Sequence, residues 1–253
     1  MNEAAIAAGA PSFAQPVIPL GWRLRLGVLM PSVNTVSEPT LAAMLPPGVS
    51  LHCTRLKLVG STDEEILGMM DGVEDASRLL ADCKPDRILF HCTAVTTFEE
   101  GIDGRIRDRI TGATGIAASV TSEALVAAFR ALNARRVVMV TPYIDAVNRR
   151  EIAFLAAHGI EVIASHGAGL PGGEAFATVE PAVWYRRTME LRDPAADAYF
   201  VSCAQTRTGE IIAALEHDLG KPVVTSNTAA FWYCLRQSGL GDVVPGFGRL
   251  FRC

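Results

Sequence analysis

The sequence predicts an α/β fold of two similar Rossmann-like lobes, whose parallel sheets are related by pseudo-twofold symmetry with the active site between them. Short, nearly continuous apolar runs, typical of strands buried on both faces of a parallel sheet, alternate with helical patterns along the chain. One strand ends in Pro31 and a later one in Cys92, and a second such pair ends in Pro142 and Cys203. The separation is the same in both pairs (92 − 31 = 203 − 142), which indicates two related lobes that each offer one thiol.

The elements of the first lobe follow from apolar runs and from helix-capping residues. Strands are predicted at residues 24–30, 49–58, 87–92 and 115–119. The first helix opens at Ser37, with a serine cap and an early proline at Pro39. Ser61, Thr62 and the acidic residues after them cap a long helix, in which apolar residues recur at helical spacing as far as Leu80.

The second lobe repeats this alternation. From residue 121 to the C-terminus, strands are predicted at 136–141, 160–165, 198–203 and 222–225, and helices at 121–135, 145–158, 208–219 and 228–237. Strand-helix-strand units connect with right-handed crossovers, so each lobe is expected to form a doubly wound parallel sheet. We assign residues 23–120 together with 222–253 to the first lobe and residues 121–221 to the second. Residues 1–22, rich in alanine and proline, are expected to form a flexible N-terminal arm.

The composition is that of a globular protein and disfavours several classes. Hydrophobic residues make up 49% of the 253 and charged residues 20%, and no stripe of lysine or arginine suits a nucleic acid. No apolar run reaches the roughly 18 to 20 residues that span a bilayer. At the N-terminus Glu3 precedes a weak apolar stretch without a basic leader, which disfavours a secretory signal. The cysteines lack the short paired spacings of a disulfide scaffold or a zinc site. We therefore expect a cytoplasmic homo-oligomer without a metal, bound neither to membrane nor to nucleic acid.

Two cysteines stand where ligands bind in this kind of fold. In open α/β sheets the binding crevice lies beyond the carboxyl ends of the strands. Pro31, Cys92, Pro142 and Cys203 all occupy such ends, whereas the strand that holds Cys53 continues beyond it. We therefore predict that Cys92 and Cys203 are the catalytic thiols and that the other four cysteines are small apolar or surface residues.

A thiol that directly precedes a helix meets unpaired backbone N–H groups and the positive end of the helix dipole. Both stabilise the thiolate, so a lowered pKa is expected at the two catalytic cysteines. The same backbone amides are placed to hold a substrate carboxylate or an enolate oxygen; they belong to Thr93, Ala94, Ala204 and Gln205.

Polar loops after the first strand of each lobe complete the predicted site. Asn34, close to Pro31, can donate its amide N–H to a carboxylate, and Tyr143 stands at the corresponding place in the second lobe with a hydroxyl that can do the same. Asn227, after the last strand, is predicted to cap a helix. A glycine-rich stretch at 167–173 matches no nucleotide-binding motif and is expected to be a mobile loop bordering the site.

With these residues the chain resembles the aspartate/glutamate racemase superfamily, and within it the branch of maleate cis-trans isomerases and arylmalonate decarboxylases. The resemblance runs from about residue 23 to the C-terminus and is carried by residues 31–35, 91–93, 141–143, 202–205 and 222–227. It implies a cofactor-independent enzyme that encloses a small carboxylate between two cysteines. In such isomerases Cys92 would add to the alkene as a thiolate, which allows the bond to rotate, and Cys203 would exchange the proton.

The resemblance leaves other functions open. In racemases and epimerases the two thiols act as opposed acid and base across an α-carbon. Decarboxylases of the branch use Cys203 with a dioxyanion site at Thr93 and Tyr143 but lack the first cysteine, so Cys92 favours an isomerase or racemase. Maleate isomerases carry an asparagine in the loop where this chain has two glycines and Glu174, which would repel a dianion if it pointed inward. A carboxylate-binding protein without catalysis is the non-enzymatic alternative.

Overall fold

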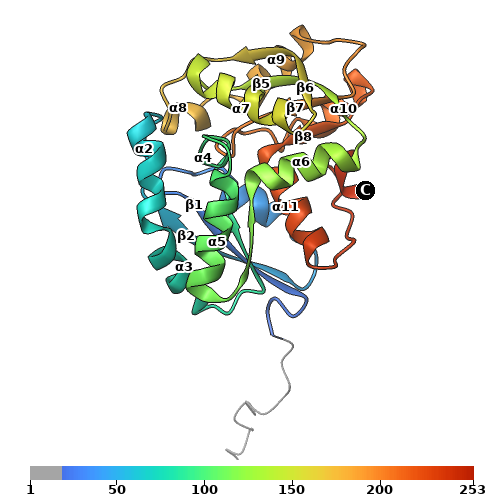
Figure 1. Ribbon diagram of the computed structural model, residues 1–253. Coiled ribbons are helices and arrows are strands. Elements are labelled where there is room, and N and C mark those ends of the chain that lie inside the picture. Colours follow the sequence, from blue (N-terminus) through green and yellow to red (C-terminus); the bar gives the residue numbers. More distant parts are fainter. Residues whose placement is uncertain (1–18) are drawn as a thin grey trace, which may run out of the picture.

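The structure, a computed structural model, describes residues 19–253 and contains two four-stranded parallel sheets (Figure 1). The first has the order β2-β1-β3-β4 and is formed by β1 (Leu24–Pro31), β2 (Val49–Leu56), β3 (Arg87–Phe90) and β4 (Ala117–Val120). The second has the order β6-β5-β7-β8 and is formed by β5 (Arg136–Thr141), β6 (Glu161–Gly167), β7 (Ala198–Val201) and β8 (Val223–Thr225). The same strand order in both sheets confirms the predicted α/β fold of two similar lobes. Most of the arm expected at 1–22 lies outside the described residues.

Helices connect and cover these strands. Those of the first lobe are α1 (Ser37–Ala43), α2 (Asp63–Gly68), the 3-10 helix η1 (Met69–Gly72), α3 (Val73–Ala81), α4 (Thr93–Thr96) and α5 (Ile102–Thr114). The later ones are α6 (Thr121–Ala131), α7 (Asp145–Ala157), α8 (Glu174–Ala177), α9 (Pro181–Glu190), α10 (Ile212–Leu219), α11 (Ser226–Gln237) and the 3-10 helix η2 (Arg249–Arg252). Helices α3 and α5 pack on the first sheet, and α9 and α10 pack on the second.

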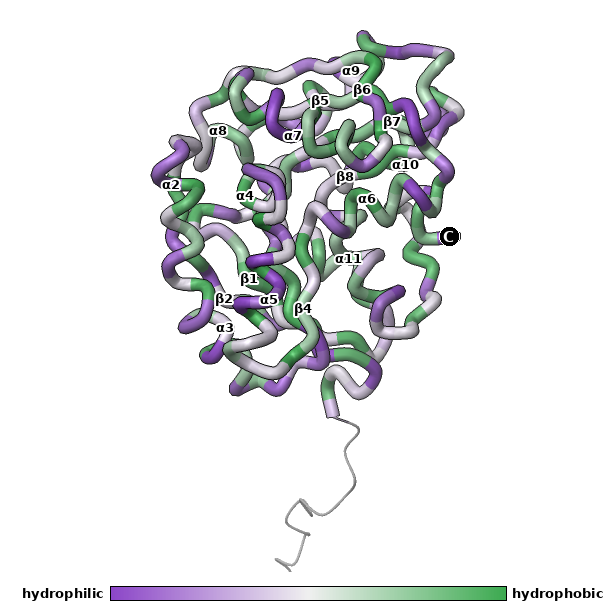
Figure 2. Tube along the Cα trace, in the orientation of Figure 1, coloured by the Kyte–Doolittle hydropathy of each residue, from purple (hydrophilic) through white to green (hydrophobic). Residues whose placement is uncertain are grey.

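The two lobes share one apolar core around α6 and α11. Each of these helices follows the last strand of its sheet, and the two pack against each other between the sheets (Figure 1). Their buried side chains join those of β1, β5 and β7 in a single cluster that includes Leu26, Phe129, Met139, Phe200 and Phe231. Figure 2 shows apolar residues concentrated along these inner elements. This shared core fixes the lobes relative to each other.

The strand at 223–225 lies in the second sheet, although residues 222–253 are predicted to belong to the first lobe. β8 pairs in parallel with β7. Only the helix that follows, α11, returns towards the first lobe, where it packs on α1 as well as on α6. The chain therefore crosses between the lobes after β8, just as it does after β4.

The long helix predicted after Ser61 is divided. Thr62 caps α2 as predicted: its hydroxyl accepts the Glu65 N–H at 3.3 Å, and the Glu65 carboxylate accepts the Thr62 N–H at 3.1 Å. The helix then tightens into η1 between Gly68 and Gly72 before α3 begins, because glycine disfavours continued helix. Helix α9 and the short helices α4 and α8 are not among the elements that the sequence predicts.

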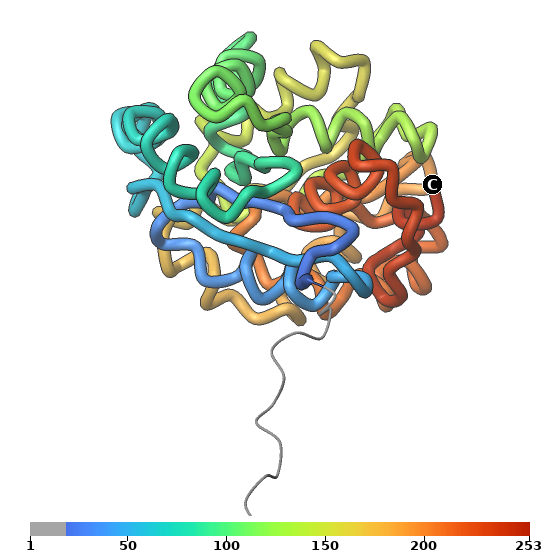
Figure 3. The backbone as a smooth tube through the Cα atoms, turned by 90° about the horizontal axis from the view of Figure 1, so that it is seen from below, coloured from blue at the N-terminus to red at the C-terminus, as the bar shows by residue number. Residues whose placement is uncertain are grey.

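The start of β1 and the C-terminal tail are tied together. The Arg23 guanidinium binds the Asp242 carboxylate through two nitrogens at 2.9 and 2.6 Å, and Figure 3 shows the two segments next to each other.

Within residues 19–253, no helix is long and apolar enough to cross a membrane.

Candidate active site

The carboxyl ends of both sheets face one cavity. β1 ends at Pro31 and β3 leads into Cys92, while the second sheet places Tyr143 after β5 and Cys203 after β7. Every residue predicted for the site lines this cavity: Pro31, Asn34, Cys92, Thr93, Ala94, Tyr143, Cys203, Ala204 and Gln205. Cys53, inside β2, does not line it. The structure thus brings together residues from two strand ends of each lobe.

The remainder of the cavity wall is mostly apolar. It is formed by Val33, Leu58, Gly60, Ser61, Ile66, Val147, Gly173 and Phe176, and no lysine, arginine or histidine of the described chain contributes to it. The Phe176 ring packs edge-on to that of Tyr143, with 5.7 Å between ring centroids. This apolar end could not be predicted from the sequence, because side chains such as Ile66 and Val147 have the same helical periodicity as ordinary core residues.

Cys92 lies directly before α4 and is buried, with 6% of its surface exposed. Burial raises the pKa of its thiol to about 11, although hydrogen bonds from the backbone N–H groups of Val95 and Ala94 lower it. The amides therefore act in the predicted direction, but the predicted low pKa is wrong because the loss of contact with water has the larger effect.

Cys203 has a strained backbone. Its φ is +89°, a region that residues other than glycine rarely adopt and that costs about 1–3 kcal/mol. Hydrogen bonds hold it there, because its N–H donates to Ser226 Oγ at 3.0 Å and its carbonyl accepts the Thr206 hydroxyl at 2.7 Å. Its Sγ accepts the Gln205 N–H at 3.3 Å. Burial raises the pKa of Cys203 to about 12, while hydrogen bonds from Tyr143 and the Gln205 amide lower it.

Two residues that open α11 connect the loops of the two cysteines. Ser226 Oγ, besides binding Cys203, accepts the Thr93 hydroxyl at 2.9 Å. Asn227 Oδ1 lies 2.8 Å from His91 Nε2, and Asn227 Nδ2 donates to the Ala204 carbonyl at 3.2 Å. The cap of α11 is Thr225, so the capping role predicted for Asn227 is wrong.

His91 is a neutral structural histidine. Burial lowers its pKa to about 4. Asn227 Oδ1 can only accept a hydrogen bond, so His91 carries its proton on Nε2. Its Nδ1 lies 3.0 Å from Thr121 Oγ1, which can donate to it. The ring therefore holds two elements together beside Cys92 and does not line the cavity.

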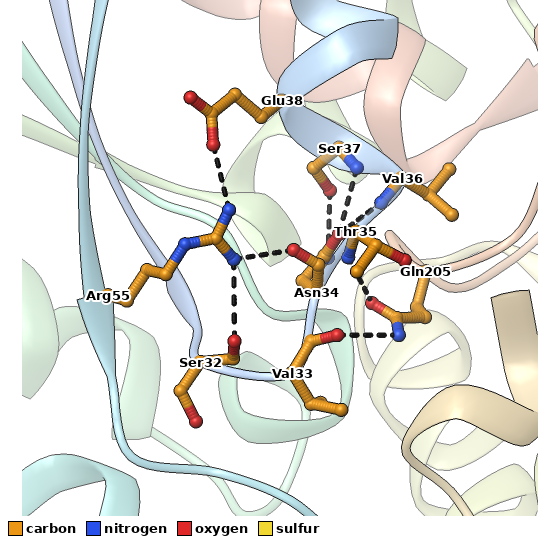
Figure 4. A network of polar contacts seen from close by, with 9 residues as sticks. All are labelled: Ser32, Val33, Asn34, Thr35, Val36, Ser37, Glu38, Arg55 and Gln205. Atoms are coloured by element: carbon orange, nitrogen blue, oxygen red, sulfur yellow. Dashed lines mark hydrogen bonds and ion pairs between the residues drawn. The ribbon is translucent and has the colours of Figure 1, made fainter.

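Asn34 shapes the loop after β1 (Figure 4). Its Oδ1 accepts the N–H groups of Val36 and Ser37 at 2.9 and 2.8 Å, and its Nδ2 donates to Ser37 Oγ at 2.9 Å. Asn34 thus satisfies the first amides of α1, and the serine cap predicted at Ser37 is wrong. Since the amide nitrogen carries two hydrogens, one is left for a ligand. Arg55 supports the same loop by donating to the Asn34 carbonyl at 2.5 Å.

Gln205 binds the loop after β1 (Figure 4) and also the glycine-rich loop of its own lobe. Its Nε2 donates to the carbonyls of Val33 and Gly173 at 2.9 and 3.2 Å, and its Oε1 accepts the Thr35 N–H at 3.2 Å. The glycine-rich loop therefore borders the cavity at Gly173, as expected. Glu174 is exposed and does not line the cavity.

Chemically, the arrangement presents two thiols and several hydrogen-bond donors to one small space. Of the described residues, no three histidine, cysteine, aspartate or glutamate side chains gather closely enough to hold a metal ion. Thiols can add to an electrophilic carbon or exchange protons with carbon, and the donors can hold a carboxylate.

Comparisons with known proteins place the chain in a family. Residues 26–251 match the family model described as arylmalonate decarboxylase. The chain is 30% identical over 248 residues to the maleate isomerase of Nocardia farcinica, covering 90% of this chain and 95% of that protein. It is also 30% identical over 230 residues to the arylmalonate decarboxylase of Bordetella bronchiseptica, covering 89% and 95%.

A solved structure resembles the whole described fold. It is that of a mutant Nocardia farcinica maleate cis-trans isomerase with a covalently bound succinylcysteine intermediate, with a TM-score of 0.86 and 25% identity over 90% of this chain and 98% of that one. The family model spans nearly all described residues, and the relatives include isomerases and a decarboxylase. The chain therefore belongs to the arylmalonate decarboxylase family.

Proposed function

We propose that this protein is a cofactor-independent cis-trans isomerase of a small carboxylate, with a maleate-like cis-enedioate as the first candidate substrate. The observation that carries the proposal is the pair Cys92 and Cys203, which come from corresponding strand ends of the two lobes and line the same cavity. The covalent succinylcysteine intermediate of the Nocardia farcinica relative supports a thiol that adds to carbon.

In the proposed cycle, the Cys92 thiolate forms a bond from sulfur to one alkene carbon. The π electrons move to the neighbouring carbon, which takes the proton of the Cys203 thiol, so the former double bond becomes a single bond and rotates. The Cys203 thiolate then removes the proton again, the carbon–sulfur bond breaks, and the trans alkene leaves. The backbone N–H groups of Ala94 and Val95 stabilise the Cys92 thiolate, and the Gln205 N–H stabilises that of Cys203.

The size of the cavity supports a small substrate. Its volume, measured as room for the centres of water molecules, is about 50 Å³, and each water needs roughly 10–15 Å³ on this measure. That is space for a few groups of water size, which suits a four-carbon acid. The Tyr143 hydroxyl, the free Asn34 N–H and backbone amides supply donors for its carboxylates.

Decarboxylation is the second candidate, and the apolar end of the cavity favours it. Apolar surroundings destabilise a buried carboxylate, and this cost is relieved when the group leaves as neutral carbon dioxide and its charge passes to the remaining carbon. Cys203 would then protonate the resulting carbanion, with Thr93 and Tyr143 at the remaining carboxylate. The thiol of Cys92 has no task in this reaction, which is why we rank isomerisation first.

Proton NMR of the purified protein with maleate in D2O, without added cofactor, tests the proposal. We expect fumarate to appear, and both Cys92→Ser and Cys203→Ser to abolish its formation. The absence of both fumarate and solvent exchange would contradict the proposal. A phenylmalonate sample tests carbon dioxide release, and deuterium entering the stereocentre of an amino acid or hydantoin would show a racemase. If all these samples stay unchanged, the alternative of a carboxylate-binding protein without catalysis is favoured.

A further inference from the structure

Glu151 is buried behind the site and has a carboxylate oxygen without a partner. It lies on α7 and is 0% exposed. Its Oε1 accepts the Ser202 hydroxyl at 2.6 Å, whereas its Oε2 is buried with no hydrogen-bond partner among the described residues. A buried carboxylate without a cation is costly to fold around. Its presence therefore indicates a role that packing alone does not explain.

The carboxylate of Glu151 is connected to Cys203 in two ways. Ser202, whose hydroxyl it binds, is the residue directly before Cys203 and is itself held by a hydrogen bond from its N–H to the Val140 carbonyl at 2.9 Å. The negative charge of Glu151 also raises the pKa values of Tyr143 and Cys203. No such contribution from Glu151 reaches the thiol of Cys92.

We propose that Glu151 is a positioning residue for the proton of Cys203: its carboxylate fixes Ser202, and its negative charge keeps Cys203 in the thiol form. The effect is selective, because Cys92 lies in the other lobe. Glu151 thereby makes two otherwise similar cysteines unequal, with Cys203 as the acid and Cys92 as the nucleophile. Only the roles of acid and nucleophile rest on the proposed function; the effect of Glu151 on the Cys203 thiol does not depend on it.

The charge state of Glu151 depends on pH in the physiological range. Burial raises its pKa to about 7, and the Ser202 hydrogen bond lowers it. The titratable groups that face it from neighbouring segments are Tyr143 and Cys203. Other ionisable side chains on α7 and the adjoining β6 do not contribute to its pKa shift; they are Asp145, Arg149, Arg150, Glu161 and His166. Glu151 is therefore mostly ionised at pH 8 and mostly protonated at pH 6.

Thiol labelling without substrate tests this inference independently of any isomerase activity. Iodoacetamide labelling of Cys92 and Cys203 is followed by peptide mass spectrometry in the wild type and in Glu151→Gln. Both thiols line the same cavity, so Cys92 controls for access. At pH 8 we expect Cys203 to be labelled at least about threefold faster in the variant, equivalent to half a pKa unit, with Cys92 changed less than about twofold. At pH 6 the two proteins should label alike.

Two controls keep the inference testable. Glu123→Gln removes a half-buried carboxyl that pairs with Arg107 and should leave both labelling rates unchanged. In the wild type alone, the ratio of Cys203 to Cys92 labelling should fall as pH rises through about 7, because Glu151 ionises there. The inference is overturned if Cys203 is labelled equally fast in the wild type and in Glu151→Gln at pH 8, or if the variant accelerates labelling of both cysteines equally. It is also overturned if the ratio of Cys203 to Cys92 labelling in the wild type does not change with pH.

Discussion

The hydroxyl of Thr93 and the amide of Cys203 donate hydrogen bonds to the same atom, Ser226 Oγ, at 2.9 and 3.0 Å. Thr93 follows Cys92 in the first lobe, whereas Cys203 belongs to the second. One oxygen at the start of α11 therefore sets the distance between the loops that carry the two thiols.

Ser226→Ala should lower both stability and turnover. Two buried donors lose their acceptor, which costs about 1–3 kcal/mol, and the spacing of the thiols relaxes, so we expect kcat/KM in the isomerase assay to fall at least about tenfold. Urea unfolding and NMR-detected turnover measure the two effects. The control is Ser77→Ala, which removes a buried hydroxyl bonded to the Val73 carbonyl within α3 and should leave turnover unchanged. Full turnover in Ser226→Ala would contradict the shared-acceptor role.

The backbone strain at Cys203 predicts an unusual order of stability. Because its φ is +89°, glycine fits this position without the strain that alanine keeps, so Cys203→Gly should be about 1 kcal/mol more stable than Cys203→Ala. At Cys92, where φ is −152°, glycine only adds freedom to the unfolded chain and the order should reverse. Chemical unfolding of the four variants measures this. If the alanine variant were more stable than the glycine variant at both positions, the backbone of Cys203 would not be strained.

Acid should destabilise the protein through His91. Its pKa is about 4 in the folded chain against an ordinary 6.5, so the unfolded chain binds a proton that the folded chain excludes. This contribution is present above pH 6.5 and is lost as pH falls towards 4, by about 2–3 kcal/mol at pH 4.5. Glu151 acts in the opposite sense, because its raised pKa costs stability as pH rises through 7.

Comparison with His91→Gln separates these contributions, because both proteins keep Glu151. The advantage of the wild type over the variant in unfolding free energy should shrink by about 2–3 kcal/mol between pH 7 and pH 4.5. His158→Gln, at an exposed position, should show no such change. A pH-independent difference between the wild type and His91→Gln would contradict the buried neutral histidine.

Residues at strand ends could be predicted from the sequence, whereas their partners could not. The repeated Pro-to-Cys separation and the apolar runs locate Cys92 and Cys203 through local signals alone. Ser226 follows the last strand and so stands at a predictable strand end, whereas Glu151 reaches the site only because α7 packs beside it, and nothing local indicates that packing. The short strand β8, only 3 residues long, likewise carries no signal of the sheet it joins. Cys203, unlike Cys92, does not directly precede a helix, since α10 begins only at Ile212. Burial is also a tertiary property, which is why hydrogen bonds from backbone amides to the thiols could be predicted but not the net pKa shift.

Gly173 should control access to the cavity. Its φ is +58°, and a Cβ at this position would lie 2.8 Å from the Val59 carbonyl oxygen, so Gly173→Ala must move the loop and disturb the 3.2 Å bond from Gln205 to the Gly173 carbonyl. We expect KM to rise about fivefold, equivalent to roughly 1 kcal/mol, with kcat less affected.

Gly169→Ala is the matched control for this loop. Gly169 has a φ of +66° but open space around its Cβ position. Alanine there must also adopt a positive φ, which costs about 1 kcal/mol of stability, but it meets no collision, so KM should stay unchanged. Steady-state kinetics and thermal unfolding of the two variants separate the strain from the contact. An equal rise in KM in both would show that strain in the loop, and not the approach of Gly173 to Val59, limits substrate binding.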